Sequence, residues 1–238
     1  KEAKKLGADY IATGHYARIV GNRLLRAVDL NKDQTYFLSQ LSQEQLQKTM
    51  FPLGHLQKPE VREIAEKYGL VNSHKPDSQD ICFVPDGDYS SFIKKFKNID
   101  VPEGDFVSTD GKFLGKHKGI INYTIGQRKG LGIALGKPAY VVKKNIPENQ
   151  VVIGDESDLY TSSLDACDVN LIPFDTLEKP IEITAKTRYS QSEQNAVLSY
   201  KGDGIYHVEF EKPQRAVTKG QAVVFYDGDI VVGGGTII

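Results

Sequence analysis

The chain has 238 residues, of which 39% are hydrophobic and 26% charged, which is typical of one large globular domain or two to three small ones. No stretch has the length and apolarity of a membrane span, so we expect no membrane partner, and the net charge of −1 does not by itself indicate nucleic acid. The two cysteines follow no disulfide or metal-binding spacing, which predicts a reducing, cytoplasmic setting and no metal site.

The first residues have the pattern of an α/β domain. Residues 1–6 resemble the end of a helix that stops at Gly7, and residues 9–13 form a short apolar run typical of a strand. Gly14 and His15 follow at the carboxyl end of that strand, where open α/β sheets bind ligands. We therefore expect the C-terminal part of a doubly wound domain whose first strands precede this chain. His15 could equally be a turn residue with a satisfied imidazole.

Residues 31–37 place differing hydrogen-bonding side chains before an aromatic pair, which predicts either a recognition loop or an ordinary helix start. Ser42 and Gln45 form a capping-box pattern that opens a short helix. A second helix is predicted to start at Pro59 and to end at Gly69, because apolar residues recur between them at helical spacing.

Cys82 lies in the stretch 75–84 (KPDSQDICFV), where acids and small polar residues precede a short apolar run. A free cysteine is most often a buried small hydrophobe. The functional alternative is a nucleophile or sulfur carrier, which needs thiolate character and access to solvent. This stretch alone favours the first interpretation. Cys82 could pair with Cys167, although nothing in the sequence favours that disulfide.

Beyond residue 85 the composition changes. A short amphipathic helix over 89–97 is followed by Gly, Pro and β-branched residues. Residues 110–144 hold eight Lys or Arg side chains and one acid, a local charge of +7 that indicates either a polyanion-binding surface or an ordinary solvated one. Glycines within this block would let backbone approach a phosphate, but their spacing matches no P-loop or dinucleotide fingerprint.

The last third of the chain is predicted to be almost entirely strand. Candidates from residue 168 onward are 181–186, 195–200, 206–210, 222–226 and 230–232, the last two joined by the turn Asp227-Gly228. Before them, residues 140–144 and 150–153 are predicted to pair around a turn that contains Pro147. Short strands at this spacing predict a small barrel or sandwich. The predicted fold class is therefore α/β followed by β, with domains at 1–84, 85–168 and 169–238.

Several motifs together resemble the tRNA-specific 2-thiouridylases. They are residues 9–18 (DYIATGHYAR), 32–34 (KDQ), 77–83 (DSQDICF), 123–132 (YTIGQRKGLG), 188–189 (RY), 220–221 (GQ) and 233–235 (GGG), in the same order along the chain. Each motif is weak alone, but so many in register are specific. The resemblance implies a Rossmann-like adenine-nucleotide domain of the PP-loop type, a central tRNA-binding domain and a C-terminal β-barrel.

The resemblance also implies a mechanism. The family activates the C2 carbonyl of the wobble uridine with Mg-ATP and replaces its oxygen with sulfur carried as a cysteine persulfide. Cys82 matches the persulfide-bearing cysteine, and Gly14 matches a position where backbone lies against ATP. The family's Ser-Gly-Gly-x-Asp-Ser motif and first catalytic cysteine are not present here, so we expect a fragment that is inactive alone. A protein that donates persulfide sulfur is the implied partner besides tRNA.

The resemblance further implies tRNA contacts at seven positions: His15, Lys32, Asp33, Gln34, Arg188, Tyr189 and Gln221. Their chemistry fits, since Arg and Lys suit phosphate, Tyr stacks on bases and Gln reads base edges. Two other functions stay open. One is an RNA-binding module without catalysis, which would not need Cys82, and the other is a different PP-loop enzyme, which would need ATP but no persulfide.

Overall fold

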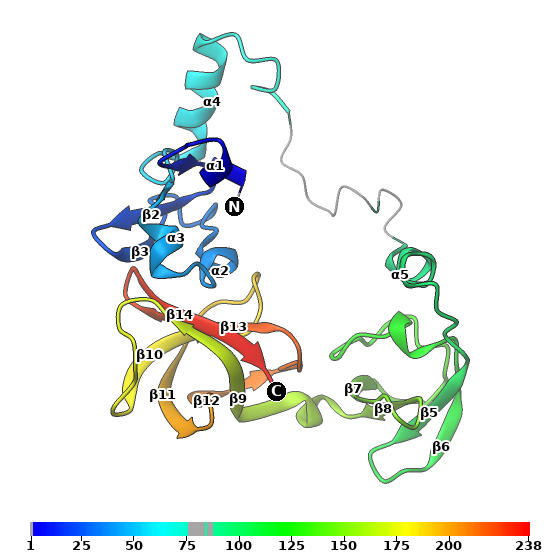
Figure 1. Cartoon of the computed structure of the whole chain (residues 1–238). Helices are drawn as coiled ribbons and strands as arrows, with labels where there is room; N and C mark the ends of the chain where they lie inside the picture. The colour runs from blue at the N-terminus through cyan, green and yellow to red at the C-terminus, as the bar shows by residue number, and fades with distance from the viewer. Residues whose placement is uncertain (1, 76–83, 85–87) are drawn as a thin grey trace. The chain divides into compact units, whose positions relative to one another are not determined.

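The computed structural model describes residues 2–75, 84 and 88–238, so Cys82 lies outside the described residues. The chain forms two compact units (Figure 1). Unit one combines Lys1–Lys75 with Ser162–Lys212 and Thr218–Ile238, and unit two combines Pro76–Thr161 with Pro213–Val217. Unit one therefore joins the N-terminal segment to the C-terminal strands, which the sequence analysis assigns to separate domains.

The N-terminal segment of unit one is a small α/β arrangement. Its elements are α1 (Glu2–Lys5), β1 (Ile11–Ala12), β2 (Ala17–Val20), β3 (Arg23–Arg26), α2 (Thr35–Leu38), α3 (Gln43–Leu46), β4 (Thr49–Met50) and α4 (Lys58–Lys67). Strands β1 and β4 pair in parallel, and β2 and β3 form an antiparallel hairpin. The predicted capping box is confirmed, because the Ser42 side chain accepts from the Gln45 N–H and the Gln45 side chain accepts from the Ser42 N–H.

A closed barrel of six strands makes up the rest of unit one. Its strands are β9 (Tyr160–Leu171), β10 (Ile181–Lys186), β11 (Gln194–Gly202), β12 (Ile205–Arg215), β13 (Ala222–Asp227) and β14 (Ile230–Ile237). They pair in the order β13-β10-β11-β12-β9-β14, and β13 pairs again with β14 to close the barrel. The predicted strands from residue 181 onward are confirmed. Strand β9 runs through residue 168, where the sequence analysis places a domain boundary, and the three-domain division stays a prediction.

One hydrophobic core unites the N-terminal segment and the barrel. Its members come from both parts of the sequence: Ala17, Leu24, Leu38, Leu46, Phe51, Ile172, Val224, Tyr226 and Val231. In addition, Leu25 of β3 pairs with Ile230 of β14, which extends the barrel sheet into the β2–β3 hairpin. These contacts fix the position of α2 and its preceding loop against the barrel.

The run Gly233–Gly235 serves close packing of β14. A Cβ added to Gly233 would lie 2.2 Å from the Asn170 carbonyl oxygen, and one added to Gly234 would lie 2.7 Å from the Ser39 hydroxyl. Only glycine permits strand β9 and the end of α2 to approach this closely. This motif, quoted above for its family resemblance, therefore has a structural explanation within the chain.

Unit two is built on a four-stranded sheet with the order β6-β5-β8-β7. Its elements are α5 (Tyr89–Lys97), β5 (Gly104–Ser108), β6 (Phe113–His117), β7 (Tyr140–Asn145) and β8 (Gln150–Gly154), with 3₁₀ turns at Ile120–Asn122 and Glu156–Leu159. Phe106, Tyr123, Val141 and Val151 lie in its core. None of the helices in the described parts of either unit is long and apolar enough to cross a membrane.

Candidate functional site

The loop 32–34 is held in place by hydrogen bonds of its own polar side chains. One carboxylate oxygen of Asp33 accepts from the Ala27 N–H at 2.9 Å, and the other accepts from the Thr35 hydroxyl at 2.5 Å. The Gln34 side-chain oxygen accepts from the Tyr16 N–H at 2.9 Å. Both side chains therefore shape the loop, and any contact with RNA would come in addition to this role.

Gly14 and His15 directly precede Tyr16, which is hydrogen-bonded to both the backbone and the side chain of Gln34. Both residues therefore lie close to the loop 32–34. Gly14 is exposed, and a Cβ there would meet only Leu53 Cδ1 at 3.6 Å, an ordinary contact. Nothing among the described residues thus requires glycine at this position. His15 Nδ1 lies 3.0 Å from the Thr13 hydroxyl, and its ring packs edge-on against Phe51.

Helix α2 brings the predicted contact residues of the barrel to the same place. The Tyr36 hydroxyl donates to the Ala222 carbonyl at 2.9 Å, directly beside Gln221. The Phe37 and Tyr189 rings pack with centroids 4.6 Å apart and an interplanar angle of 34°, and Tyr36 meets Tyr189 edge-on at 6.0 Å. Loop 32–34, Tyr189 and Gln221 therefore surround one short helix, although they come from distant parts of the sequence.

Arg188 and Gln221 are both hydrogen-bonded within the barrel. Arg188 donates from Nη2 to the Thr218 hydroxyl at 3.1 Å. Gln221 takes part in backbone bonds to Thr218 and Ile237, while its side-chain oxygen is buried and has no hydrogen-bond partner among the residues that the structure describes. An unsatisfied buried acceptor is costly, which makes this amide a candidate for a ligand or water contact.

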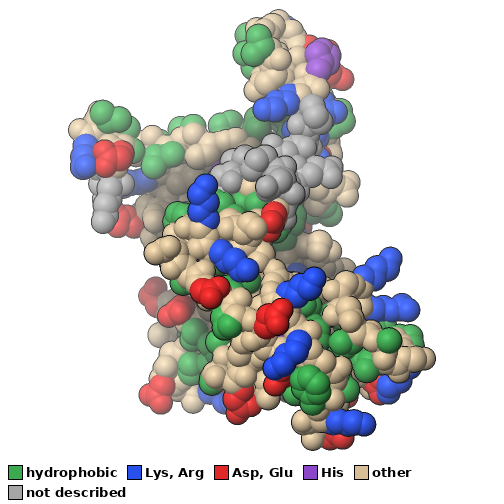
Figure 2. All heavy atoms as spheres, turned by 90° about the vertical axis from the view of Figure 1, so that its right-hand side faces the viewer, with side chains coloured by type: hydrophobic (Ala, Val, Ile, Leu, Met, Phe, Trp, Pro, Cys, Tyr) green, Lys and Arg blue, Asp and Glu red, His purple; other side chains and the backbone are tan. Residues whose placement is uncertain are grey.

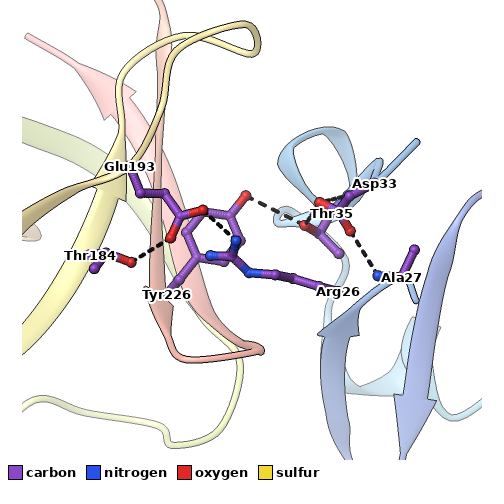
Figure 3. Close-up of polar contacts among 7 residues, drawn as sticks. All are labelled: Arg26, Ala27, Asp33, Thr35, Thr184, Glu193 and Tyr226. Carbon is purple, nitrogen blue, oxygen red and sulfur yellow. Dashed lines mark hydrogen bonds and ion pairs between the residues drawn. The ribbon is translucent and has the colours of Figure 1, made fainter. Parts of the chain in front are cut away.

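A polar network joins the N-terminal segment to the barrel (Figure 3). Arg26 forms an ion pair with Glu193, and its guanidinium carbon lies 4.1 Å from the centroid of the Tyr226 ring. Glu193 also accepts from the Thr184 hydroxyl at 2.7 Å, and the Tyr226 hydroxyl lies 3.4 Å from that of Thr35. The network thus links β3, α2, β10 and β13 with the short loop that ends at Glu193.

Electrostatics within this network favour the ionised pair. Burial by itself would raise the pKa of the Glu193 carboxyl, but hydrogen bonds from Arg26 and Thr184 outweigh it and hold that pKa below its usual value. Burial by itself would lower the pKa of Arg26, but the hydrogen bond to Glu193 and the negative charge of Glu193 outweigh it and raise the pKa of Arg26. Burial raises the pKa of Tyr226, so its hydroxyl stays protonated and able to donate.

A pocket of about 340 Å³ opens between the loop and the barrel. Its walls come from both parts of unit one: Arg26, Leu30, Asn31, Asp33, Lys186, Tyr189, Ser190, Glu193 and Tyr226. Lys186 lies over the Tyr189 ring, with Nζ 5.8 Å from the ring centroid. The pocket is polar with aromatic walls, and such a lining suits a flat ligand with hydrogen-bonding edges.

The basic block lies in unit two, where Lys and Arg side chains are spread over the face seen in Figure 2 with acids among them. Three of its lysines are already engaged. Lys116 pairs with Asp105 at 2.5 Å, Lys137 pairs with Asp155 at 2.7 Å, and the half-buried Lys144 donates to a backbone carbonyl. Burial lowers the pKa of Lys144. Lys116 and Lys137 are exposed despite these pairs, and the other exposed members are Lys112, Lys118, Arg128, Lys129 and Lys143.

Of the two cysteines, the structure describes Cys167, on strand β9. Its sulfur lies 3.4 Å from an Asp168 carboxylate oxygen, and partial desolvation together with that carboxylate raises the pKa of the thiol. A raised pKa disfavours the thiolate, so Cys167 is a poor candidate for a nucleophile. Among the described residues, no group of three or more His, Cys, Asp or Glu is arranged to hold a metal ion.

Comparison with known proteins gives the family. Family profiles described as a tRNA methyl transferase HUP domain, a tRNA methyl transferase PRC-barrel domain and an aminomethyltransferase β-barrel domain match residues 1–86, 90–155 and 161–237. The tRNA-specific 2-thiouridylase MnmA of Clostridioides difficile is 51% identical, over 100% of this chain and 67% of the relative. The chain belongs to the tRNA-specific 2-thiouridylase family.

Other relatives agree. The tRNA-specific 2-thiouridylase MnmA 2 of Clostridium botulinum (strain Loch Maree) is 54% identical, over 99% of this chain and 68% of the relative. The 2-thiouridylase of Acetivibrio thermocellus is 52% identical, over 99% of this chain and 67% of the relative. The predicted family is thus confirmed. The profile matches also fit the predicted α/β segment followed by β domains, including the six-stranded barrel.

Sequence reasoning missed the residues behind the predicted contacts. Arg26 and Glu193 are 167 positions apart, and no local pattern links them. Lys186 lies beside the motif 188–189 without being part of it, whereas Asn31 and Phe37 belong to the stretch 31–37 that is predicted as either a recognition loop or a helix start. For Phe37 a signal was available, since it belongs to the aromatic pair that follows the loop 32–34.

Proposed function

We propose that the full-length protein that contains this chain carries out ATP-dependent 2-thiolation of the wobble uridine of tRNA. The observation that carries this proposal is identity of 51–54% to tRNA-specific 2-thiouridylases over essentially the whole chain. The matched region spans both the N-terminal segment and the barrel, because it covers 99–100% of this chain.

The chemistry proceeds in two steps. The uridine C2 oxygen attacks the α-phosphorus of ATP, which forms an adenylated uridine and releases pyrophosphate. The terminal sulfur of a Cys82 persulfide then forms a bond to C2, and the C2–O bond breaks so that AMP leaves with the oxygen. The thiolate of a second cysteine then attacks the inner sulfur, that of Cys82, and forms a disulfide with it. The S–S bond to the transferred sulfur breaks, and its electron pair stays on the sulfur at C2, which releases 2-thiouridine. Adenylation is needed because a carbonyl oxygen is otherwise a poor leaving group.

The described residues fit supporting roles in this reaction. Gly14 fits a backbone contact with ATP, because it is exposed and no neighbour within the described chain crowds a Cβ there. The parallel pair β1–β4 fits the edge of a PP-loop domain, in which nucleotide binds at the carboxyl ends of parallel strands. Mg²⁺ would accompany the ATP phosphates. His15, Lys32, Asp33, Gln34, Arg188, Tyr189 and Gln221 are proposed to contact tRNA.

The 238 residues contain no Ser-Gly-Gly-x-Asp-Ser motif, so we expect this chain alone not to adenylate tRNA. We also expect the sulfur to come from a separate persulfide-donating protein, and the reaction to take place in the cytoplasm. Among the described residues, the exposed part of the basic block offers a phosphate-binding surface for the tRNA stem.

The test uses the full-length protein in wild-type and Cys82→Ser forms, each incubated with tRNA, Mg-ATP and a persulfide donor. Digested tRNA is then analysed for 2-thiouridine by mass spectrometry. We expect product from the wild type and none from the variant. Product from both would remove Cys82 from the mechanism. Consumption of ATP with bound tRNA and no product from the wild type would instead favour another PP-loop reaction.

A further inference from the structure

The Phe37 and Tyr189 rings form an exposed aromatic pair beside the pocket in unit one. Phe37 is 59% exposed and Tyr189 44% exposed, and both rings also pack edge-on against Tyr36. A tilted aromatic pair with this exposure is a rigid apolar surface that solvent reaches directly. Nothing in the reaction described above uses Phe37.

The adjoining pocket has a balanced set of charges. Arg26 and Lys186 supply two positive charges, and Asp33 and Glu193 supply two negative ones. Arg26 and Glu193 neutralise each other at the floor, while Asp33 is occupied by Ala27 and Thr35. A site with no net charge does not suit a phosphate group, which favours an excess of cations.

The groups at the rim of the pocket can both donate and accept hydrogen bonds. Asn31 and Ser190 are exposed there, and the half-buried Lys186 lies over the Tyr189 ring. A nucleobase has the matching chemistry, because it is flat, uncharged and lined with donors and acceptors at its edge. The volume of about 340 Å³ lies at the lower end of small-molecule pockets, which span about 300–1,000 Å³.

We propose that Phe37 and Tyr189 form a stacking platform for one unstacked anticodon-loop base other than the target uridine, with Asn31 and Lys186 at the edge of that base. This inference rests on the proposed function and specifies how the same protein holds its RNA. Phe37, Asn31 and Lys186 are then binding residues, and the Arg26–Glu193 pair is a positioning element beneath them. The platform holds the loop open while the target uridine reaches the reaction centre.

The test is a double-mutant cycle between protein and RNA. Binding of the 238-residue chain to a fluorescent anticodon stem–loop is measured by anisotropy, with each loop nucleotide in turn replaced by an abasic one. The protein variants are Phe37→Leu and Tyr189→Leu, which keep an apolar side chain but remove the ring. Each should weaken binding of the intact RNA about 5- to 150-fold, the usual effect of losing one stacked base.

The abasic substitution at one loop position should weaken wild-type binding by a similar factor and should have no further effect on either variant. The salt dependence of binding should stay unchanged in both, because stacking releases no counterions. The matched control is Tyr200→Leu, which breaks another aromatic pair on the barrel, between the exposed Tyr200 and the half-buried Tyr206, whose ring centroids lie 5.0 Å apart. We expect this control to bind like the wild type.

Two results would overturn the platform. One is that the losses of binding affinity from the protein substitution and from the abasic substitution add at every loop position, which would mean that no base is coupled to either ring. The other is that the wild-type chain shows no binding to the stem–loop. Neither result touches the proposed function, which the formation of 2-thiouridine by the full-length protein decides separately.

Discussion

Replacing Arg26 or Glu193 with leucine tests whether the polar network holds the N-terminal segment against the barrel. The side chain of Arg26 is 16% exposed and that of Glu193 is 23% exposed, so each single substitution leaves a largely buried charge without its partner. Arg26 is already under-satisfied, because its Nε and Nη2 atoms are buried with no hydrogen-bond partner among the described residues.

The magnitude follows from this burial. Exposed ion pairs contribute about 0–1 kcal/mol, whereas removal of one partner from a buried pair costs about 3–5 kcal/mol. With less than a quarter of either side chain exposed, we expect each single leucine variant to lose about 3 kcal/mol of unfolding free energy. The double variant should recover most of that loss, since two apolar side chains leave no charge to desolvate.

The assay is urea unfolding followed by circular dichroism on the wild type, both single variants and the double variant. Because the chain has two compact units, two transitions are fitted, and only that of unit one should move. Lys201→Gln is the matched control from unit one. Lys201 forms an exposed pair with Asp165, so its loss should stay within about 0.5 kcal/mol. The reasoning would be refuted if each single variant lost less than about 1 kcal/mol of unfolding free energy, or if the loss in the double variant equalled the sum of the two single losses.

Three further predictions concern pH, packing and charge. Folding lowers the pKa of Glu193, so the ionised carboxylate stabilises the fold fully above its unfolded pKa of about 4.3, and this stabilisation is lost as pH falls through the folded pKa. The difference in urea midpoint between wild type and Glu193→Leu should therefore be constant above about pH 5 and shrink below about pH 4. Gly234→Ala should lower the unfolding free energy measured in urea by about 1–3 kcal/mol, because its Cβ would lie 2.7 Å from a serine hydroxyl. Gly14→Ala, where a Cβ is not crowded, should unfold like the wild type, and equal midpoints for the two variants would contradict the packing argument. In filter binding at low salt, Arg128→Glu should weaken affinity for tRNA and reduce its salt dependence more than Lys116→Glu, since Lys116 is already paired; equal effects would mean that the ion pair does not persist in solution.

Local patterns in the sequence predicted most of the secondary structure. The capping box at Ser42 and the strands from residue 181 onward depend on spacings of two to four residues, which a sequence displays directly. No predicted strand covers β5, β6 or β9. In β9, residues 160–167 mix polar and small residues without clear alternation. Its position is determined by pairing with β14, a contact made far along the chain.

The sequence supplies candidate contact residues but not their arrangement in space. Resemblance to the 2-thiouridylases named Gln34, Tyr189 and Gln221, and the structure places all three around α2. The ion pair of Arg26 with Glu193 has no sequence signal, because each residue alone resembles an ordinary surface charge. The shared hydrophobic core and the pairing of β3 with β14 bring these two parts of the chain together, and contacts at that range cannot be derived from composition or periodicity.

The most direct test of the proposed reaction follows the oxygen that sulfur replaces. Transfer RNA labelled with ¹⁸O at C2 of the wobble uridine is incubated with the full-length protein, Mg-ATP and a persulfide donor, and both nucleoside and AMP are analysed by mass spectrometry. The proposed mechanism predicts 2-thiouridine together with ¹⁸O in the phosphate of AMP, in equal amounts. Formation of 2-thiouridine with unlabelled AMP would contradict activation of the C2 oxygen by adenylation, and labelled AMP without 2-thiouridine would contradict sulfur transfer.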